Sequence, residues 1–152
     1  MLKKTITLFS VLFFAAQLFA QIENPVSWSY SSKKIGTKKY ELHITATIQN
    51  SWHIYAQKAG DGPEPTTLNF KKNPLLKLEG KVKEVGKLET AFDPNFNSTL
   101  RFYNKTVDFV QIVNLKSAVN TVVKGSVNFM VCNERKCLPP KEIPFSINID
   151  AK

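Results

Sequence analysis

Apolar and polar residues alternate along much of the chain beyond residue 25, and a period of two is typical of half-buried β-strands. The clearest alternation runs through residues 40–49, where every second residue from Tyr40 to Ile48 is apolar and each residue between them is polar. The pattern predicts strands at residues 26–33, 40–49, 52–56, 66–70, 75–85, 100–115, 122–131 and 143–149. No segment after residue 20 has the apolar stripe and the caps of a helix.

Glycine and proline mark breaks between these segments, at residues 60–63, 73–74, 93–94 and 139–140. Seven or more short strands in about 130 residues, with no repeat and no linker, predict one all-β domain. We expect an immunoglobulin-like antiparallel β-sandwich, and a small barrel is the alternative.

Residues 1–20 have the features of a secretory signal peptide. Lys3 and Lys4 form a basic start, an apolar stretch follows, and the small residue Ala20 precedes the expected cleavage point. The apolar stretch is too short to favour a membrane span, although an uncleaved anchor is the alternative. We therefore expect residues 21–152 to form an exported, extracytoplasmic domain without a membrane span.

The chain is basic, with 21 Lys and Arg residues against 12 Asp and Glu residues and a formal charge of +9. Removal of Lys3 and Lys4 with the signal peptide leaves 19 basic side chains and a charge of +7. The lysines are spread in pairs, such as Lys71-Lys72, and no basic tract is interleaved with aromatic residues. This distribution argues against a nucleic-acid partner and favours a solvated positive surface, with attraction to acidic partners or to an anionic membrane face left open.

Two turn-rich stretches, residues 57–65 and 89–99, are long enough to carry function. The second contains Phe92 and Phe96 in polar surroundings. Such phenylalanines either fold back onto the core or cover a group that must stay dry until a partner binds.

The only cysteines, Cys132 and Cys137, are separated by four residues near the end of the domain. In an oxidising compartment they are predicted to form a disulfide. A bond that closes so short a loop stabilises the fold by about 2 kcal/mol in the loop-entropy model, so its small mechanical value favours a chemical role. Arg135 and Lys136 beside Cys137 favour its thiolate, while Glu134 opposes this effect.

Neither a metal site nor a thioredoxin-like fold fits these cysteines. Zinc requires about four ligands, and the only histidines, His43 and His53, are distant in sequence and lie in strand-like segments. The cysteine spacing is not C-x-x-C, and no alternation of strands and helices surrounds it. We therefore expect no metal and no cofactor, and we interpret each histidine as an ordinary strand residue.

Three blocks of sequence carry a resemblance to a known family. They are SWHIY at residues 51–55 with PTTLNF at 65–70, FDPNF at 92–96 leading into RFY at 101–103, and CLPP at 137–140. The resemblance covers about residues 24–150. The cysteine block, which ends in two prolines, is the most specific of the three. The chain resembles the N-terminal, periplasmic domain of the thiol:disulfide interchange protein DsbD.

The resemblance implies an immunoglobulin-like sandwich with a redox pair on neighbouring strands, in which Cys137 is the attacking thiol and Cys132 the resolving one. It also implies thiol–disulfide exchange in the periplasm, without a cofactor. Electrons would come from a thioredoxin-like donor and pass to oxidised exported proteins, such as disulfide isomerases or cytochrome c maturation proteins.

The resemblance further implies a cap loop that carries a phenylalanine over the cysteine pair. Phe96 matches this residue best because it lies seven residues before Tyr103, and Phe92 is the second choice, with Asp93 in the same loop. The residues expected to support the site are Tyr103, Pro139 and Pro140.

The chain also departs from the family pattern. Four residues separate its cysteines, where the best-known members have one more. The full-length proteins contain a transmembrane electron conduit and a thioredoxin-like domain, so we expect a separate protein to be the donor, and the direction of electron flow stays open. The alternative function is a non-catalytic immunoglobulin-like binding module whose disulfide is inert.

Overall fold

The structure is a computed structural model that describes residues 23–94 and 96–151. The predicted signal peptide at residues 1–20 lies outside the described residues. Every regular element in the described part is a β-strand, and this part contains no helix of the length and apolarity that crossing a membrane requires. The strands are β1 Val26–Gly36, β2 Lys39–Ile48, β3 His53–Tyr55, β4 Thr67–Phe70, β5 Leu76–Gly86, β6 Glu89–Asp93, β7 Ser98–Tyr103, β8 Thr106–Leu115, β9 Thr121–Phe129, β10 Val131–Cys132 and β11 Lys141–Ile149.

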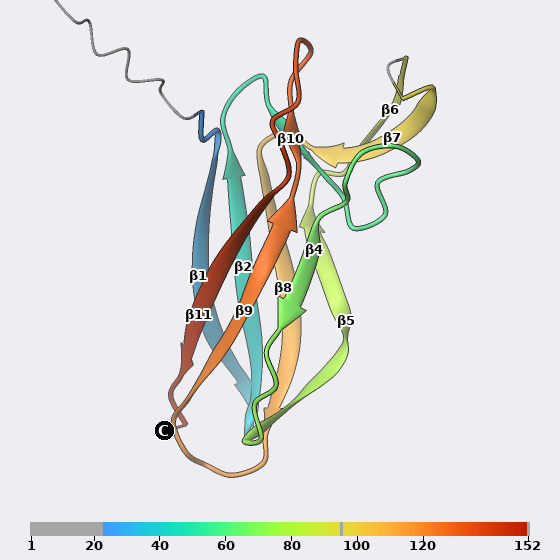
Figure 1. Cartoon of the computed structure of the whole chain (residues 1–152). Coiled ribbons are helices and arrows are strands. Elements are labelled where there is room, and N and C mark those ends of the chain that lie inside the picture. The colour runs from blue at the N-terminus through green and yellow to red at the C-terminus, as the bar shows by residue number, and fades with distance from the viewer. Residues whose placement is uncertain (1–22, 95, 152) are drawn as a thin grey trace, which may run out of the picture.

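The strands form three antiparallel sheets, with the orders β1-β2-β8-β5, β11-β9-β4 and β10-β3-β7-β6. The first two sheets face each other as a sandwich, and the third lies at one end of it, beside the hairpin that follows β10 (Figure 1). The β1–β2 turn, the β4–β5 loop and the β8–β9 loop lie at the opposite end (Figure 1). The prediction of an all-β, immunoglobulin-like antiparallel sandwich is confirmed.

Apolar side chains from both facing sheets fill the space between them. Leu42, Ile44 and Ala46 of β2 are fully buried, because alternate residues of a strand point to the same face. Trp28 of β1 contacts Phe129 of β9 across the sandwich, with ring centroids 5.1 Å apart. Full burial of a large apolar side chain stabilises a fold by about 1.5–3 kcal/mol, so this interior holds the two sheets together.

The structure differs from the sequence prediction in the segment that builds the third sheet. The single strand predicted at residues 100–115 is two strands, β7 and β8, which belong to different sheets and separate at Asn104-Lys105. The predicted loop 89–99 contains β6, whose residues are mostly exposed and pair with β7. An exposed edge strand has no buried face, so its sequence lacks the apolar alternation by which strands are predicted.

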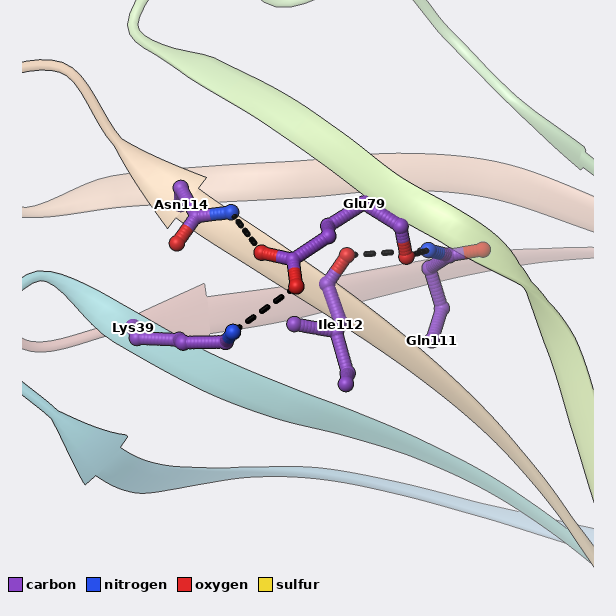
Figure 2. A network of polar contacts seen from close by, with 5 residues as sticks. All are labelled: Lys39, Glu79, Gln111, Ile112 and Asn114. Atoms are coloured by element: carbon purple, nitrogen blue, oxygen red, sulfur yellow. Dashed lines mark hydrogen bonds and ion pairs between the residues drawn. The ribbon is translucent and has the colours of Figure 1, made fainter.

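A polar network supports β5 where its pairing with β8 becomes irregular after Glu79 (Figure 2). The side-chain amide of Gln111 is buried and donates to the backbone carbonyls of Glu79 and Ile112, both at 2.9 Å. The Glu79 carboxylate accepts hydrogen bonds from Lys39 at 2.8 Å and from Asn114 at 2.6 Å, and these bonds lower its pKa. Gln111 therefore satisfies a backbone carbonyl at the point where regular strand pairing is interrupted.

Candidate functional site

The chain leaves β10 through a tight hairpin that places Cys132 opposite Cys137. Backbone hydrogen bonds flank this pair on both sides: one joins Leu138 N–H to Val131 C=O, and the other joins the ends of the intervening loop, each at 2.9 Å. The cysteines therefore occupy a non-hydrogen-bonded pair, where opposed side chains of antiparallel strands come closest. Their Cα atoms are 4.0 Å apart, and the predicted disulfide is present.

Asn133 shapes the loop between the cysteines. Its side-chain oxygen accepts hydrogen bonds from the backbone N–H groups of Arg135 at 2.8 Å and Lys136 at 2.9 Å, which is the pattern of an Asx turn. The Lys136 ammonium forms an ion pair with Glu23 at 2.5 Å. Because this carboxylate offsets the charge of Lys136, the positive potential expected beside Cys137 depends more on Arg135.

The two cysteines differ in their exposure to solvent. Cys132 is 2% exposed and packs in a small apolar cluster with Tyr55, Ala59 and Leu100. Cys137 lies on the outer arm of the hairpin and is exposed. A second protein that approaches the hairpin therefore reaches Cys137 first, a distinction that the sequence alone left open.

An aromatic surface lies beside the buried cysteine. His53 of β3 is opposite Cys132 in the strand register, and directly opposed residues point to the same face of a sheet. Its Nε2 atom lies 3.3 Å from the Tyr55 hydroxyl, and its ring centroid lies 4.7 Å from that of Phe102. We call these three side chains, His53, Tyr55 and Phe102, the aromatic floor.

The aromatic floor was not predicted as part of the site. His53 was interpreted as an ordinary strand residue, and Tyr55 and Phe102 entered only as members of the blocks at residues 51–55 and 101–103. The two-residue spacing of His53 and Tyr55 was the available signal, because it places both side chains on one face of a strand. Their position beside Cys132 depends on pairing between segments about 80 residues apart, which no local pattern reveals.

The aromatic floor is electrically neutral near pH 7. Burial lowers the pKa of His53, and the negative charge of Asp93 opposes this shift more weakly. Burial, and then Asp93, raises the pKa of Tyr55 to about 12. Cys132 therefore faces an uncharged aromatic surface, and Asp93 lies close enough to act on both titrating groups.

A pocket lies over the aromatic floor, between the end of β6 and the cysteine hairpin. It is lined on one side by Ala91, Phe92, Asp93 and Pro94, and on the other by Asn133 and Glu134. The predicted cap residues Phe92 and Asp93 thus lie across a pocket from the loop that joins the cysteines.

The two candidate cap phenylalanines have different surroundings. Phe96 is half-buried and packs against the apolar cluster that contains Cys132. Its ring also lies against Gly62, where an added Cβ atom would be 2.4 Å from Phe96 Cδ1. Phe92 is 62% exposed at the rim of the pocket. Phe96 therefore packs on the cluster that contains Cys132, while Phe92 projects into solvent.

The residues expected to support the site lie in two different places. Tyr103 is buried in the main core, where burial raises its pKa to about 12, and it pairs with Ile54 on the face opposite the aromatic floor. It therefore supports β3 from behind and does not contact the cysteines' side of the sheet. Pro139 and Pro140 are exposed and line an apolar groove with Leu138, directly after Cys137.

The two histidines lie apart, in different sheets. His43 belongs to β2, where its Nδ1 atom lies 2.6 Å from the Asp108 carboxylate, whereas His53 belongs to β3. Within residues 23–94 and 96–151, no three His, Cys, Asp or Glu side chains gather in a way that could hold a metal ion.

Three solved structures share this fold at low sequence identity. The N-terminal periplasmic domain of ScsB from Proteus mirabilis is 15% identical with a TM-score of 0.53, over 83% of this chain and 45% of that one. The N-terminal domain of DsbD from Neisseria meningitidis in its reduced form is 16% identical with a TM-score of 0.53, over 81% and 86% of the two chains. The complex between the DsbD and PilB N-terminal domains of Neisseria meningitidis gives 15% identity and a TM-score of 0.51, over 83% and 87%.

The alignment spans less than half of the ScsB chain. Comparison with curated proteins gives no match. The family model described as the N-terminal part of thiol:disulfide interchange protein DsbD matches residues 23–148, which include the cysteine hairpin and the aromatic floor. With that match over most of its length, the chain belongs to the family of DsbD N-terminal domains.

Proposed function

We propose that this chain carries out thiol–disulfide exchange outside the cytoplasm, relaying electrons through Cys132 and Cys137. The observation that supports this most strongly is the unequal burial of the pair, with Cys137 exposed on the outer arm of a hairpin and Cys132 buried beneath it. Exchange requires one sulfur that a partner can reach and a second that is held close for the resolving step.

The reaction begins from the reduced pair. The Cys137 thiolate attacks a partner disulfide, the partner's S–S bond breaks, and the leaving sulfur takes up a proton. The Cys132 thiolate, formed by loss of its proton, then attacks the Cys137 sulfur of the mixed disulfide. The second partner sulfur leaves and is protonated, and the Cys132–Cys137 bond forms again. The partner gains two electrons and two protons, and this chain, counted from its dithiol form, loses the same number.

The oxidised pair must then be reduced by a separate protein. A thioredoxin-like donor fits this role, because its own dithiol can attack the exposed Cys137 sulfur through the same kind of mixed disulfide. The acceptors are oxidised exported proteins, such as disulfide isomerases or cytochrome c maturation proteins. The relay operates in the periplasm or an equivalent compartment. Residues 1–20 direct the chain there as a signal peptide that is then cleaved.

The cap loop, formed by the end of β6 together with Phe96, covers the pair. Its Phe96 packs on the apolar cluster around Cys132, and Phe92 and Asp93 line the pocket that separates the loop from the cysteine hairpin. Docking of a partner would move this loop aside, and its return would limit reaction with stray oxidants.

Two cysteine variants test the relay. Cys132→Ser is expected to accumulate a mixed disulfide with a thioredoxin-like protein, because the resolving sulfur is absent, whereas Cys137→Ser forms none. Non-reducing gel electrophoresis and mass spectrometry detect the adduct, and the double variant is the control. Normal exchange by Cys137→Ser would contradict the assignment of the attacking thiol.

The reduction potential separates the relay from an inert binding module. An exchange protein has a potential in the range of glutaredoxins and thioredoxins, roughly −200 to −270 mV, whereas a purely structural bond lies below about −300 mV. Equilibration with glutathione or with a thioredoxin of known potential measures this value. A potential far below the thioredoxin range would leave the binding module as the function.

A further inference from the structure

The end of the sandwich opposite the cysteine hairpin is formed by three connected loops (Figure 1). They are the β1–β2 turn, the β4–β5 loop and the β8–β9 loop. Leu115 N–H donates to Lys38 C=O at 2.7 Å, and Lys116 N–H donates to Leu75 C=O at 2.9 Å. Asn73 adds a side-chain bond to Val122 C=O at 3.1 Å. These bonds join the loops into one surface, which we call the basic tip.

Three large aliphatic side chains are exposed at the basic tip. Ile35, at the end of β1, is 41% exposed, Leu75 is 39% exposed in the β4–β5 loop, and Val119 is 44% exposed in the β8–β9 loop. A single exposed aliphatic residue is ordinary on a protein surface. The same feature on three segments that hydrogen bonds hold together is what a surface that meets an apolar phase would carry.

Lysines surround these aliphatic side chains. Residues 33–39, 71–77 and 116–120 contain no Asp or Glu and include Lys33, Lys34, Lys38, Lys39, Lys71, Lys72, Lys77 and Lys116. Lys39 is paired with Glu79 in the network of Figure 2, and the other lysines of these segments are exposed. The opposite end mixes both signs, since Glu23, Asp93 and Glu134 lie around the cysteine hairpin there. Three acidic residues lie next to these segments: Glu41 opposite Lys33, Glu79, and Asp150 beside the residue that bonds Asn120. The eight lysines outnumber them, so this end of the domain carries net positive charge.

We propose that the basic tip binds the surface of an anionic phospholipid bilayer. The lysines would lie at the headgroup phosphates, and Ile35, Leu75 and Val119 would enter the interface, which is how basic amphipathic surfaces bind membranes. A single-stranded nucleic acid is a poorer fit, because none of the three loops carries an aromatic residue on which bases could stack. Bound in this way, the domain would hold its cysteine hairpin away from the membrane, toward exported proteins.

Vesicle co-sedimentation tests the proposal. The purified chain is mixed with vesicles of phosphatidylcholine alone, or with vesicles in which phosphatidylglycerol replaces roughly a third of the lipid. We expect binding only to the anionic vesicles, and weaker binding at high salt because salt screens exposed charges. Absence of binding to anionic vesicles at low salt would overturn the proposal.

Matched variants separate the basic tip from net charge. Lys38→Glu, Lys72→Glu and Lys116→Glu together are expected to weaken vesicle binding by tenfold or more. The control combines Lys58→Glu, Lys81→Glu and Lys105→Glu, which are exposed positions outside the tip and change the net charge equally. Equal loss of binding in both triple variants would refute a localised site.

A neutral variant separates a bilayer from a soluble polyanion. Ile35→Ser, Leu75→Ser and Val119→Ser together keep every charge and are expected to weaken vesicle binding clearly while heparin binding is unchanged. Vesicle binding equal to that of the natural chain would contradict insertion. Thermal unfolding checks that each variant is folded. If a triple variant fails to fold, Ile35→Trp replaces it. A blue shift of the new tryptophan's fluorescence on anionic vesicles would support insertion, and no shift would contradict it.

Discussion

Single side chains decide how the disulfide is protected. The hairpin exposes Cys137, whereas Cys132 lies in an apolar cluster against which the ring of Phe96 packs. The position of Phe96 depends in turn on Gly62, whose φ of +120° suits glycine and whose missing side chain leaves room for the ring. If Phe96 acts as the proposed cap, access to the buried sulfur depends on a residue about 70 positions earlier in the chain.

Gly62→Ala is expected to displace Phe96, because the new Cβ atom would lie 2.4 Å from the Phe96 ring. Overpacking of this kind destabilises a fold by about 1–3 kcal/mol. We also expect faster reduction of the disulfide by dithiothreitol, because the cluster around Cys132 loosens. Urea unfolding and reduction kinetics measure the two effects.

Gly80→Ala is the matched control for this variant. Gly80 also has a positive φ, +71°, but nothing lies within 4 Å of an added Cβ atom. The Gly80→Ala substitution therefore introduces backbone strain without moving Phe96. Equal reduction rates in the two variants would show that Phe96 does not protect the pair.

His53 is expected to make stability depend on pH. Because burial lowers its pKa in the folded state, the unfolded chain binds a proton more readily below about pH 6.5. The free energy of unfolding should therefore fall as the pH drops from about 7 towards 5, and recover as the pH rises. Urea unfolding at a series of pH values measures this slope.

His53→Phe is the comparison for the pH series. The substitution keeps an aromatic ring against Phe102 but removes the titrating group, and it leaves the Tyr55 hydroxyl without its 3.3 Å partner. That loss shifts stability equally at each pH, so the slope alone reports on His53. If the free energy of unfolding has the same pH slope in His53→Phe as in the natural chain between about pH 7 and pH 5, the prediction is wrong.

Individual strands depend on polar contacts where their regular pairing fails. The β5–β8 pairing is interrupted after Glu79, and the buried Gln111 side chain satisfies the Glu79 carbonyl there (Figure 2). The edge strand β6 is held by its pairing with β7 and places Phe92 and Asp93 at the rim of the pocket. Both features depend on contacts between distant segments, so neither strand follows from its own sequence.

Gln111→Leu is expected to destabilise the domain by about 1–3 kcal/mol, because it removes the two hydrogen bonds of a buried amide and takes away the Glu79 carbonyl's donor. Asn114→Ala is the control, since it removes only a bond to the exposed Glu79 carboxylate and should change stability by about 0.5 kcal/mol or less. Chemical denaturation measures both. A loss in Gln111→Leu no larger than that in Asn114→Ala would show that the carbonyl finds another donor.

The domain as one body has two chemically different ends. One carries the cysteine hairpin, the aromatic floor and charges of both signs, and the other is the basic tip. The sandwich between them is built from long strands with a continuous apolar interior, so the two ends are held at a fixed separation. This arrangement would let one end contact a surface while the other exchanges electrons with proteins.

Much of this architecture follows from local patterns. The alternation at residues 40–49 predicts β2 because a strand with one buried face must repeat every two residues. The disulfide follows from the spacing of the only two cysteines, since no other partner exists for either. The apolar pattern did not predict β6 or the break between β7 and β8. An exposed edge strand and a crossing from one sheet to another leave no periodic signal in the sequence.

The all-β class, the cysteine pair and the resemblance to DsbD N-terminal domains could be predicted from the sequence, because each depends on patterns within short stretches of the chain. Four features are visible only in the folded chain: Cys132 is buried, Cys137 is exposed, His53 lies opposite Cys132, and the lysine-rich turns meet at one end. Burial and juxtaposition are set by pairing between distant strands, and that pairing is a property of the folded chain as a unit.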